Sequence, residues 1–158
     1  MNKEELIELL KEYNTNKAKL NIRLKELKTA RIKLKNKNFE TSITSSFGIN
    51  QDIQSKNKIS NKVLKKIESN EKIKEEAERG ISNLEKEVRE LREKVEQVKD
   101  RLEGLKYKER EILIAYYIDG RTAEDVGNNL YFRLFNQTRS SRHIQRIIEK
   151  ATNKMLKL

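Results

Sequence analysis

Residues 81–105 read ISNLEKEVRELREKVEQVKDRLEGL, and hydrophobic residues recur along this stretch at alternating steps of three and four. Two positions of a heptad repeat are therefore hydrophobic. Ile81, Val88, Val95 and Leu102 fill the first position, and Leu84, Leu91, Val98 and Leu105 fill the second. Four uninterrupted heptads predict a coiled coil. β-Branched residues dominate the first position and Leu is commonest at the second, which favours two strands if the strands are parallel.

The composition of the whole chain also favours long helices. The chain has 158 residues, of which 39% are charged, with 5 Gly and no Pro. Gly and Pro are the strongest helix breakers, so their scarcity permits very long helices. Gly80 fits either a helix restart or a tolerated interior glycine, whereas Gly104 marks the end of the heptads and is the better candidate for a junction.

The N-terminal part of the chain has a weaker heptad pattern. Residues 1–35 predict an amphipathic helix whose hydrophobic positions are Leu6, Leu10, Tyr13, Leu20, Leu24, Leu27 and Leu34. Lys17 and Arg31 fill the two skipped positions, and such polar residues usually set register or partner choice. Residues 36–59 predict a flexible polar loop, and residues 60–104 a long coiled-coil helix. The N-terminal helix either folds back antiparallel on the second or pairs across a dimer, and a mixture of both is compatible with the pattern.

Residues 105–158 predict three shorter helices. The first covers residues 106–118 and ends at Asp119-Gly120, since Gly commonly follows a helix end. Thr122 is expected to cap a second helix that begins at Ala123. A third helix begins near Ser141, which is expected to cap it, and its buried face consists of Ile144, Ile147, Ile148, Ala151 and Met155. We therefore expect an all-α fold, in which elongated coiled-coil helices are followed by a small C-terminal helix-turn-helix domain (105–158).

The C-terminal end of the chain carries an excess of positive charge. The net charge is +11 and the isoelectric point about 9.7, which suggests nucleic acid or an anionic membrane surface as partner, or else a Lys-rich solubilising surface. Residues 81–104 hold 6 basic and 7 acidic side chains, whereas residues 131–158 hold 7 basic and 1 acidic. No apolar run approaches the roughly 20 residues of a membrane span. We therefore expect no membrane partner and favour nucleic acid.

The third C-terminal helix carries the side chains that a DNA reader needs. Its periodicity exposes Arg142, His143, Gln145, Arg146, Glu149 and Lys150. Cations neutralise phosphates and release counterions. Arg pairs bidentately with guanine and Gln with adenine when one helix enters the major groove. An ordinary solvated helix face is the alternative interpretation.

Four C-terminal segments carry a family resemblance. They are Leu105 with EREI at 109–112, YIDGRT at 117–122, EDV at 124–126 and SSRHIQRI at 140–147. Together they resemble phage-encoded transcriptional regulators of the ArpU/RinA type, which are similar to the DNA-binding fourth region of bacterial sigma factors. That family also places two helices and a polar loop ahead of its helix-turn-helix. The resemblance implies a phage or prophage regulator that acts in the bacterial host cytoplasm, at the nucleoid, and reads the major groove with residues 141–154.

The resemblance also implies roles for single residues. Arg142, His143 and Gln145 would face base edges, Arg146 and Lys150 the backbone, and Arg121 and Thr122 phosphates. The complete predicted DNA-binding set is Arg121, Thr122, Arg139, Ser140, Ser141, Arg142, His143, Gln145, Arg146 and Lys150. His143 is the single His and there is no Cys, so no metal and no cofactor are expected. The expected partners are double-stranded DNA, RNA polymerase, and a second copy through the coiled coil.

Residues 131–140 depart from the family pattern, because the family has a short turn at this place. The insert includes Phe132, Leu134 and Phe135. These residues fit an extension of the second helix or packing beneath the third. Base stacking and a protein contact are the other interpretations.

Other classes of protein fit less well. An enzyme is not expected, since the chain has no Gly-rich phosphate loop, no Cys and one His. A coiled-coil adaptor that binds a protein partner is the main alternative, and it is favoured by the length of the heptad pattern. A phage DNA-packaging protein similar to the small terminase subunit is another, although such proteins usually carry the DNA-binding part at the N-terminus.

Overall fold

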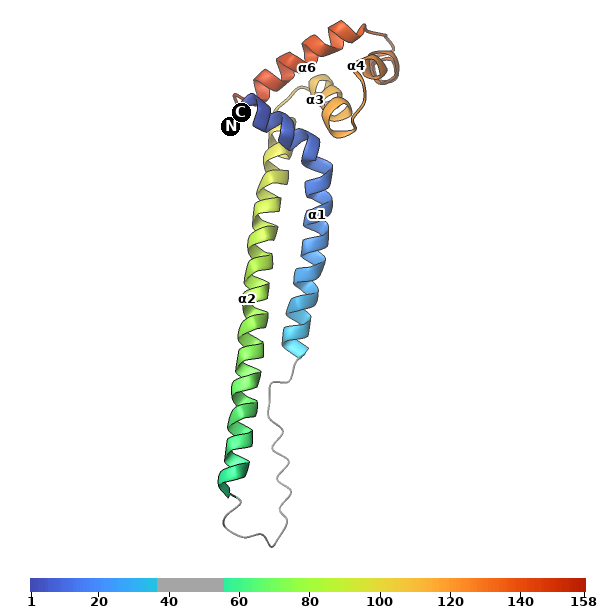
Figure 1. The fold of residues 1–158 in the computed structure, drawn as a ribbon. Coiled ribbons are helices and arrows are strands. Elements are labelled where there is room, and N and C mark those ends of the chain that lie inside the picture. Colours follow the sequence, from blue (N-terminus) through green and yellow to red (C-terminus); the bar gives the residue numbers. More distant parts are fainter. Residues whose placement is uncertain (37–55) are drawn as a thin grey trace. The chain divides into compact units, whose positions relative to one another are not determined.

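The computed structural model describes residues 1–36 and 56–158, with side chains for residues 1–36 and 67–158. Every regular element in these residues is helical, so the predicted all-α fold is confirmed (Figure 1). The elements are α1 (Lys3–Asn36), α2 (Lys56–Glu103), α3 (Tyr107–Leu113), η2 (Ile114–Ile118), α4 (Ala123–Asp125), η3 (Val126–Leu130), α5 (Tyr131–Phe135) and α6 (Ser141–Met155). The predicted loop at 36–59 lies mostly outside the described residues; at its end, α2 begins at Lys56.

The chain forms two compact units, and both long helices contribute to each. The first unit consists of Met1–Ile22 and Val88–Leu158, and the second of Arg23–Glu87. In the second unit α1 and α2 run antiparallel, joined by ion pairs from Arg23 to Glu87 (2.8 Å) and from Arg31 to Glu85 (2.6 Å). These pairs are solvent-exposed and each contributes at most about 1 kcal/mol. The two helices therefore pair within one chain, which is the first of the two architectures that the sequence leaves open.

The heptads of α2 lie where the sequence places them. Their side chains are all buried or partly buried, and Val88, Val98, Leu102 and Leu105 are the most enclosed. Gly80 is inside a continuous helix, and α2 ends directly before Gly104. In α1 the pattern shifts: Asn16 is buried (5% exposed) while the neighbouring Lys17 is exposed. The smaller amide takes the inner position because its Nδ2 lies 3.5 Å from Glu12 Oε2, and no charge is then buried.

The three C-terminal helices also follow the predicted order, with one longer than expected. The first is α3 continued by the π-helical turn η2, and it ends at Ile118, just before Asp119 and Gly120; the φ of 70° at Gly120 suits glycine. The second starts after Thr122, whose Oγ1 accepts a hydrogen bond from the backbone N–H of Asp125 (3.1 Å). It runs through α4, η3 and α5, so the first half of the 131–140 insert extends this helix. Tyr131 is buried there, whereas Phe132 is 52% exposed.

One hydrophobic core joins the N-terminal turns of α1 to the C-terminal helices. Leu6 and Leu10 are fully buried in a cluster with residues of α2, α3 and α6. Asn14 Nδ2 also donates to the carbonyl oxygen of Ile118 (3.2 Å). The start of the chain therefore supports the C-terminal helices directly. In the described residues no helix has the length and apolar character needed to cross a membrane.

We predict that Leu10→Ala destabilises the C-terminal helices although it lies more than a hundred residues away in sequence. Removing a fully buried leucine side chain costs about 2–5 kcal/mol. Urea unfolding followed by circular dichroism measures the loss. Ile22→Ala is the matched control, because Ile22 lies on the same helix and is 55% exposed. Equal stabilities of the two variants would contradict the shared core.

Candidate nucleic-acid interface

The third C-terminal helix, α6, is held in place along one face. Ile144, Ile148, Ala151 and Met155 are buried, and Ile147 is partly buried, as their spacing predicts. Thr152 is also fully buried, which the sequence did not indicate, and its Oγ1 donates to the carbonyl oxygen of Ile148 (2.8 Å). This inner face determines which side chains α6 presents to solvent.

The start of α6 is capped one residue earlier than predicted. Ser140, and not Ser141, is the N-cap, and its Oγ accepts a hydrogen bond from the backbone N–H of His143 (3.4 Å). Either serine has the chemistry of a cap. Ser140 has the extended backbone of a cap residue, whereas Ser141 is the first residue of the helix.

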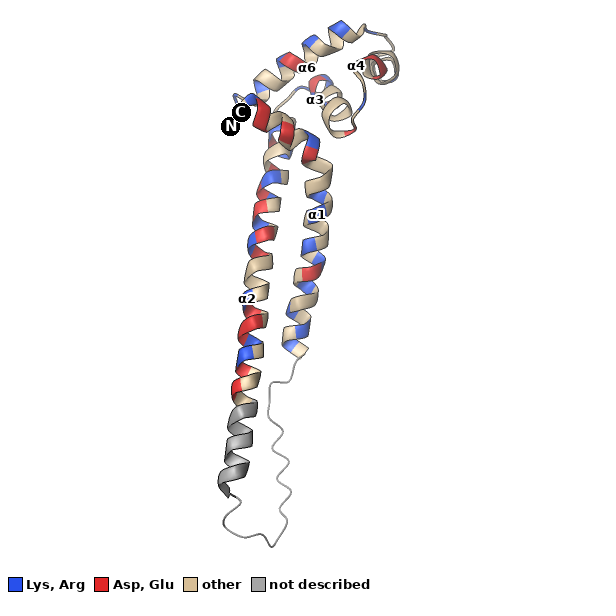
Figure 2. Ribbon diagram, viewed as in Figure 1, with Lys and Arg blue, Asp and Glu red and all other residues tan. Residues whose placement is uncertain are grey.

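The outer face of α6 carries five of the predicted DNA-binding residues. They are Arg142, His143, Gln145, Arg146 and Lys150, and all are exposed. Among the described residues, no ion pair involves Arg142, Arg146 or Lys150. Figure 2 shows blue positions spaced along α6, and Glu149 is the acidic residue of this helix. The helix therefore presents cations whose charge is not neutralised by carboxylates of the described chain.

Arg121, Thr122, Ser141 and Gln145 lie together although they are far apart in sequence. They line one surface cavity of ≈ 600 Å³ beside Tyr116, Tyr117 and Lys11. Arg121 is partly engaged, since its Nη1 lies 3.6 Å from Asp125 Oδ2. Thr122 uses its oxygen as the helix cap and keeps its hydroxyl hydrogen for a further acceptor. The first turn of the second helix and the first turns of α6 thus share one open surface.

Arg139 lies in a different environment from the residues of α6. Its Nη2 donates to Gln137 Oε1 (2.8 Å), and its guanidinium carbon is 5.7 Å from the centre of the Tyr131 ring. Lys108 approaches the same ring from α3, with Nζ 4.5 Å from the ring centre and hydrogen-bonded to the hydroxyl. Burial raises the pKa of Tyr131, but hydrogen bonds and positive charge from Lys108 and Arg139 outweigh it and lower the pKa overall. Lys108 is not among the residues that the sequence predicts for DNA binding.

Gly127 allows the second helix and the turn before α6 to approach each other closely. The backbone N–H of Arg139 donates to the carbonyl oxygen of Gly127 (3.1 Å). A Cβ atom on Gly127 would lie 2.1 Å from the carbonyl oxygen of Arg139 and 3.3 Å from Ile144 Cγ1. The turn before α6 can therefore approach only a residue without a side chain, and this approach determines the angle at which α6 leaves the turn.

We predict that Gly127→Ala destabilises the protein, by about 1–3 kcal/mol as other overpacked sites do, because backbone atoms must move. Thermal unfolding measures the effect. The control is Gly80→Ala, where no atom lies within 4 Å of the new Cβ, and where a helix-interior alanine stabilises by about 1 kcal/mol. If both changes raised the melting temperature, the turn would not depend on this contact.

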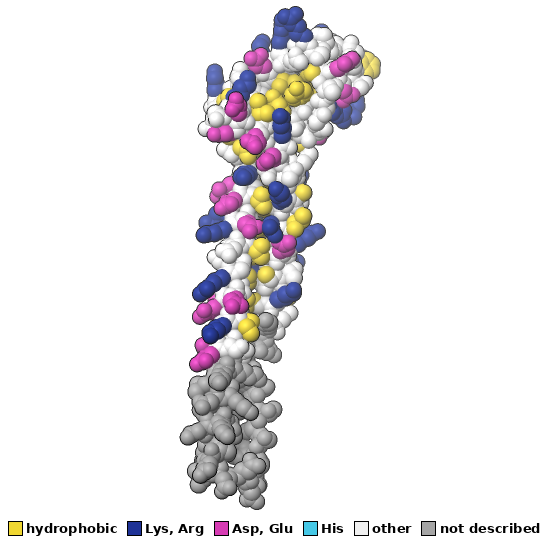
Figure 3. Space-filling view, viewed as in Figure 1, with side chains coloured by type: hydrophobic (Ala, Val, Ile, Leu, Met, Phe, Trp, Pro, Cys, Tyr) yellow, Lys and Arg dark blue, Asp and Glu magenta, His cyan; other side chains and the backbone are white. Residues whose placement is uncertain are grey.

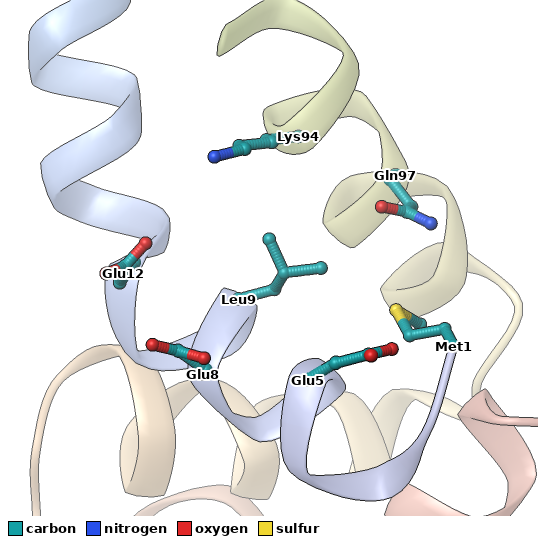
Figure 4. A pocket seen from close by; sticks show the side chains of 7 residues that line it. All are labelled: Met1, Glu5, Glu8, Leu9, Glu12, Lys94 and Gln97. Carbon is teal, nitrogen blue, oxygen red and sulfur yellow. The ribbon is translucent and has the colours of Figure 1, made fainter. Parts of the chain in front are cut away.

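A second cavity in the first unit has the opposite chemistry. It has a volume of ≈ 650 Å³ and is lined by Met1, Glu5, Glu8, Leu9, Glu12, Lys94 and Gln97. Figure 4 shows the three glutamates of α1 on one side and Lys94 and Gln97 of α2 on the other. Carboxylates outnumber the cation there, so this cavity repels phosphate. The described residues also contain no cluster of His, Cys, Asp and Glu suited to hold a metal ion.

Comparisons with known proteins gave no match: no family model, no curated protein and no solved structure is significantly similar to this chain. The interface is therefore interpreted from its own geometry and charge.

Proposed function

We propose that this protein is a sequence-specific transcriptional regulator that binds double-stranded DNA and places α6 in the major groove. The observation that carries the proposal is the division of α6 into two faces. One face is locked into the core by Ile144, Ile148 and Met155, and the other presents Arg142, Gln145 and Arg146 to solvent. A helix fixed in this way holds cationic and amide donors at defined positions, as base readout requires.

The surface beside α6 supports the same interpretation. Arg121 and Thr122, at the start of the second helix, line one cavity with Ser141 and Gln145 of α6. A guanidinium and a hydroxyl are donors that commonly contact phosphates and fix the orientation of a protein on the duplex. In this proposal they hold the backbone while α6 meets the bases. On the face of the molecule that Figure 3 shows, further Lys and Arg side chains project around the C-terminal helices.

The resemblance to phage-encoded regulators of the ArpU/RinA type narrows the proposal. It rests on the four C-terminal segments and on the order of two long helices before three short ones. In this proposal the regulator acts in the cytoplasm of a bacterial host and touches RNA polymerase as well as DNA. Residues 131–135 lengthen the second helix.

An adaptor role is the second candidate, and exposed hydrophobic residues favour it. In the second unit Leu24, Ile32 and Ile73 are 37%, 48% and 39% exposed. Such side chains on paired helices are suited to a further helix, and we propose that a second copy of the chain supplies it. A protein that is only an adaptor would show no salt-dependent affinity for duplex DNA, whereas a regulator loses affinity steeply as salt rises.

Selection of bound sequences from a random duplex library, followed by fluorescence anisotropy on the recovered site, tests the proposal. We predict that Arg142→Ala and Arg146→Ala each weaken binding to that site, by about 1–3 kcal/mol where the arginine contacts a base bidentately. Arg79→Ala is the matched control, because Arg79 is an exposed arginine of α2 in the second unit. Failure to recover any preferred sequence, or unchanged affinity in both α6 variants, would refute the major-groove assignment.

A further inference from the structure

Two cations meet at one buried tyrosine behind the turn that leads into α6. Tyr131 is 2% exposed, and its ring lies 4.8 Å from the ring of Phe135. Lys108 lies over both rings, with Nζ 4.5 Å from the centre of Tyr131 and 5.4 Å from that of Phe135. Arg139 approaches Tyr131 from the turn, at 5.7 Å. Three separate segments, namely α3, α5 and the turn before α6, therefore converge on this point.

These two cations have no carboxylate partner among the described residues. The acidic residues near Lys108 in sequence are otherwise engaged: Glu109 pairs with Lys154, and Glu111 lies 3.7 Å from Arg110. Arg139 donates to a neutral amide, that of Gln137. Like charges that share one aromatic ring repel each other, and no carboxylate of the described residues offsets this repulsion. An anion placed between them would remove it.

Cation–π attraction to an aromatic ring does not by itself explain why both Lys108 and Arg139 lie beside Tyr131. One cation over the ring already gains the cation–π attraction, as Lys17 does over Tyr13 at 6.0 Å in α1. The second cation adds repulsion to the first. Arg139 is exposed and Lys108 half-buried, so both remain accessible to a ligand from solvent. Phosphate suits this arrangement, since arginine and lysine are its usual protein partners.

We propose that Lys108 and Arg139 together bind one phosphate of the DNA backbone, at the end of the second helix opposite to Arg121 and Thr122. Tyr131 is a positioning residue, because its ring and hydroxyl hold Lys108 in place. This inference rests on the proposed function, since it supplies a second backbone contact for the same complex.

The spacing of the two contacts suits a duplex. Tyr131, which both cations approach, follows the start of the second helix at Ala123 by eight residues, which at 1.5 Å per residue is roughly 12 Å. The major groove is about 12 Å wide and has a phosphate strand on either side. Backbone contacts at the start of this helix and beside Tyr131 are therefore separated by about the width of the groove.

The test compares Lys108→Met with the wild-type chain on the selected duplex and on a random duplex, over a series of salt concentrations. Methionine keeps an apolar stem over the rings and removes the charge. We predict that affinity falls by a similar factor on both duplexes, and that the slope of log K against log salt shrinks by about 0.9, as for one lost phosphate contact on B-DNA. Lys17→Met is the matched control, since it removes another lysine that lies over a tyrosine.

Methylphosphonate substitution, one linkage at a time, locates the phosphate. At one position the neutral linkage should weaken DNA binding by the wild-type chain but have little effect on DNA binding by Lys108→Met. This difference would show that Lys108 contacts the phosphate at that position. If Lys108→Met lowers the melting temperature, Lys108→Gln is used in its place. The glutamine also removes the charge but keeps a polar amide near the Tyr131 hydroxyl. A wild-type salt slope in the folded variant, or no linkage coupled to Lys108, would overturn the inference and leave the proposed function intact. Absence of duplex binding by the wild-type chain would overturn both.

Discussion

The interface depends on the burial of one apolar stripe along α6. Ile144, Ile148, Ala151 and Met155 enter the same core as Leu6 and Leu10 of α1, and this burial fixes the rotation of α6 about its own axis. Each fully buried aliphatic side chain contributes about 1.5–3 kcal/mol. Because this stripe faces the core, the opposite face of the helix is exposed, and it carries Arg142, Gln145 and Arg146. The N-terminal residues of the chain thereby orient a helix near its C-terminus.

Local patterns were sufficient to predict most of the fold. Heptad spacing located the buried positions of α2, and Gly120 and Thr122 located the end of one helix and the start of the next, because each signal acts within a few residues. Two details of the structure differ from the sequence prediction, and each concerns a pair of adjacent residues. Two adjacent serines compete to cap α6, and Asn16 and Lys17 compete for one inner position in α1. The two serines have the same chemistry and differ only in backbone conformation, whereas at the inner position of α1 the uncharged amide is buried in place of the charged lysine.

Contacts between distant segments could not be predicted in this way. Nothing in the spacing of Leu6 and Leu10 indicates that they pack against α3 and α6, and hydrophobic contact is non-directional. Gly127 has no periodicity to identify it, yet the carbonyl oxygen of Arg139 lies where its side chain would be. In the sequence nothing distinguishes Lys108 from the other lysines, and only the fold places it beside Tyr131. For the candidate site, the residues of α6 followed from the sequence, whereas the groups that surround them required the structure.

The distribution of charge gives the two parts of the chain different electrostatic characters. Along residues 81–104 of α2 the 6 basic and 7 acidic side chains are nearly balanced, and i,i+4 pairs such as Lys99 with Glu103 form among them. Their fields largely cancel within a Debye length, about 8 Å at physiological salt. The cations of α6 lack such partners among the described residues. A polyanion would therefore be attracted to the surface that α6 exposes, and not to residues 81–104 of α2.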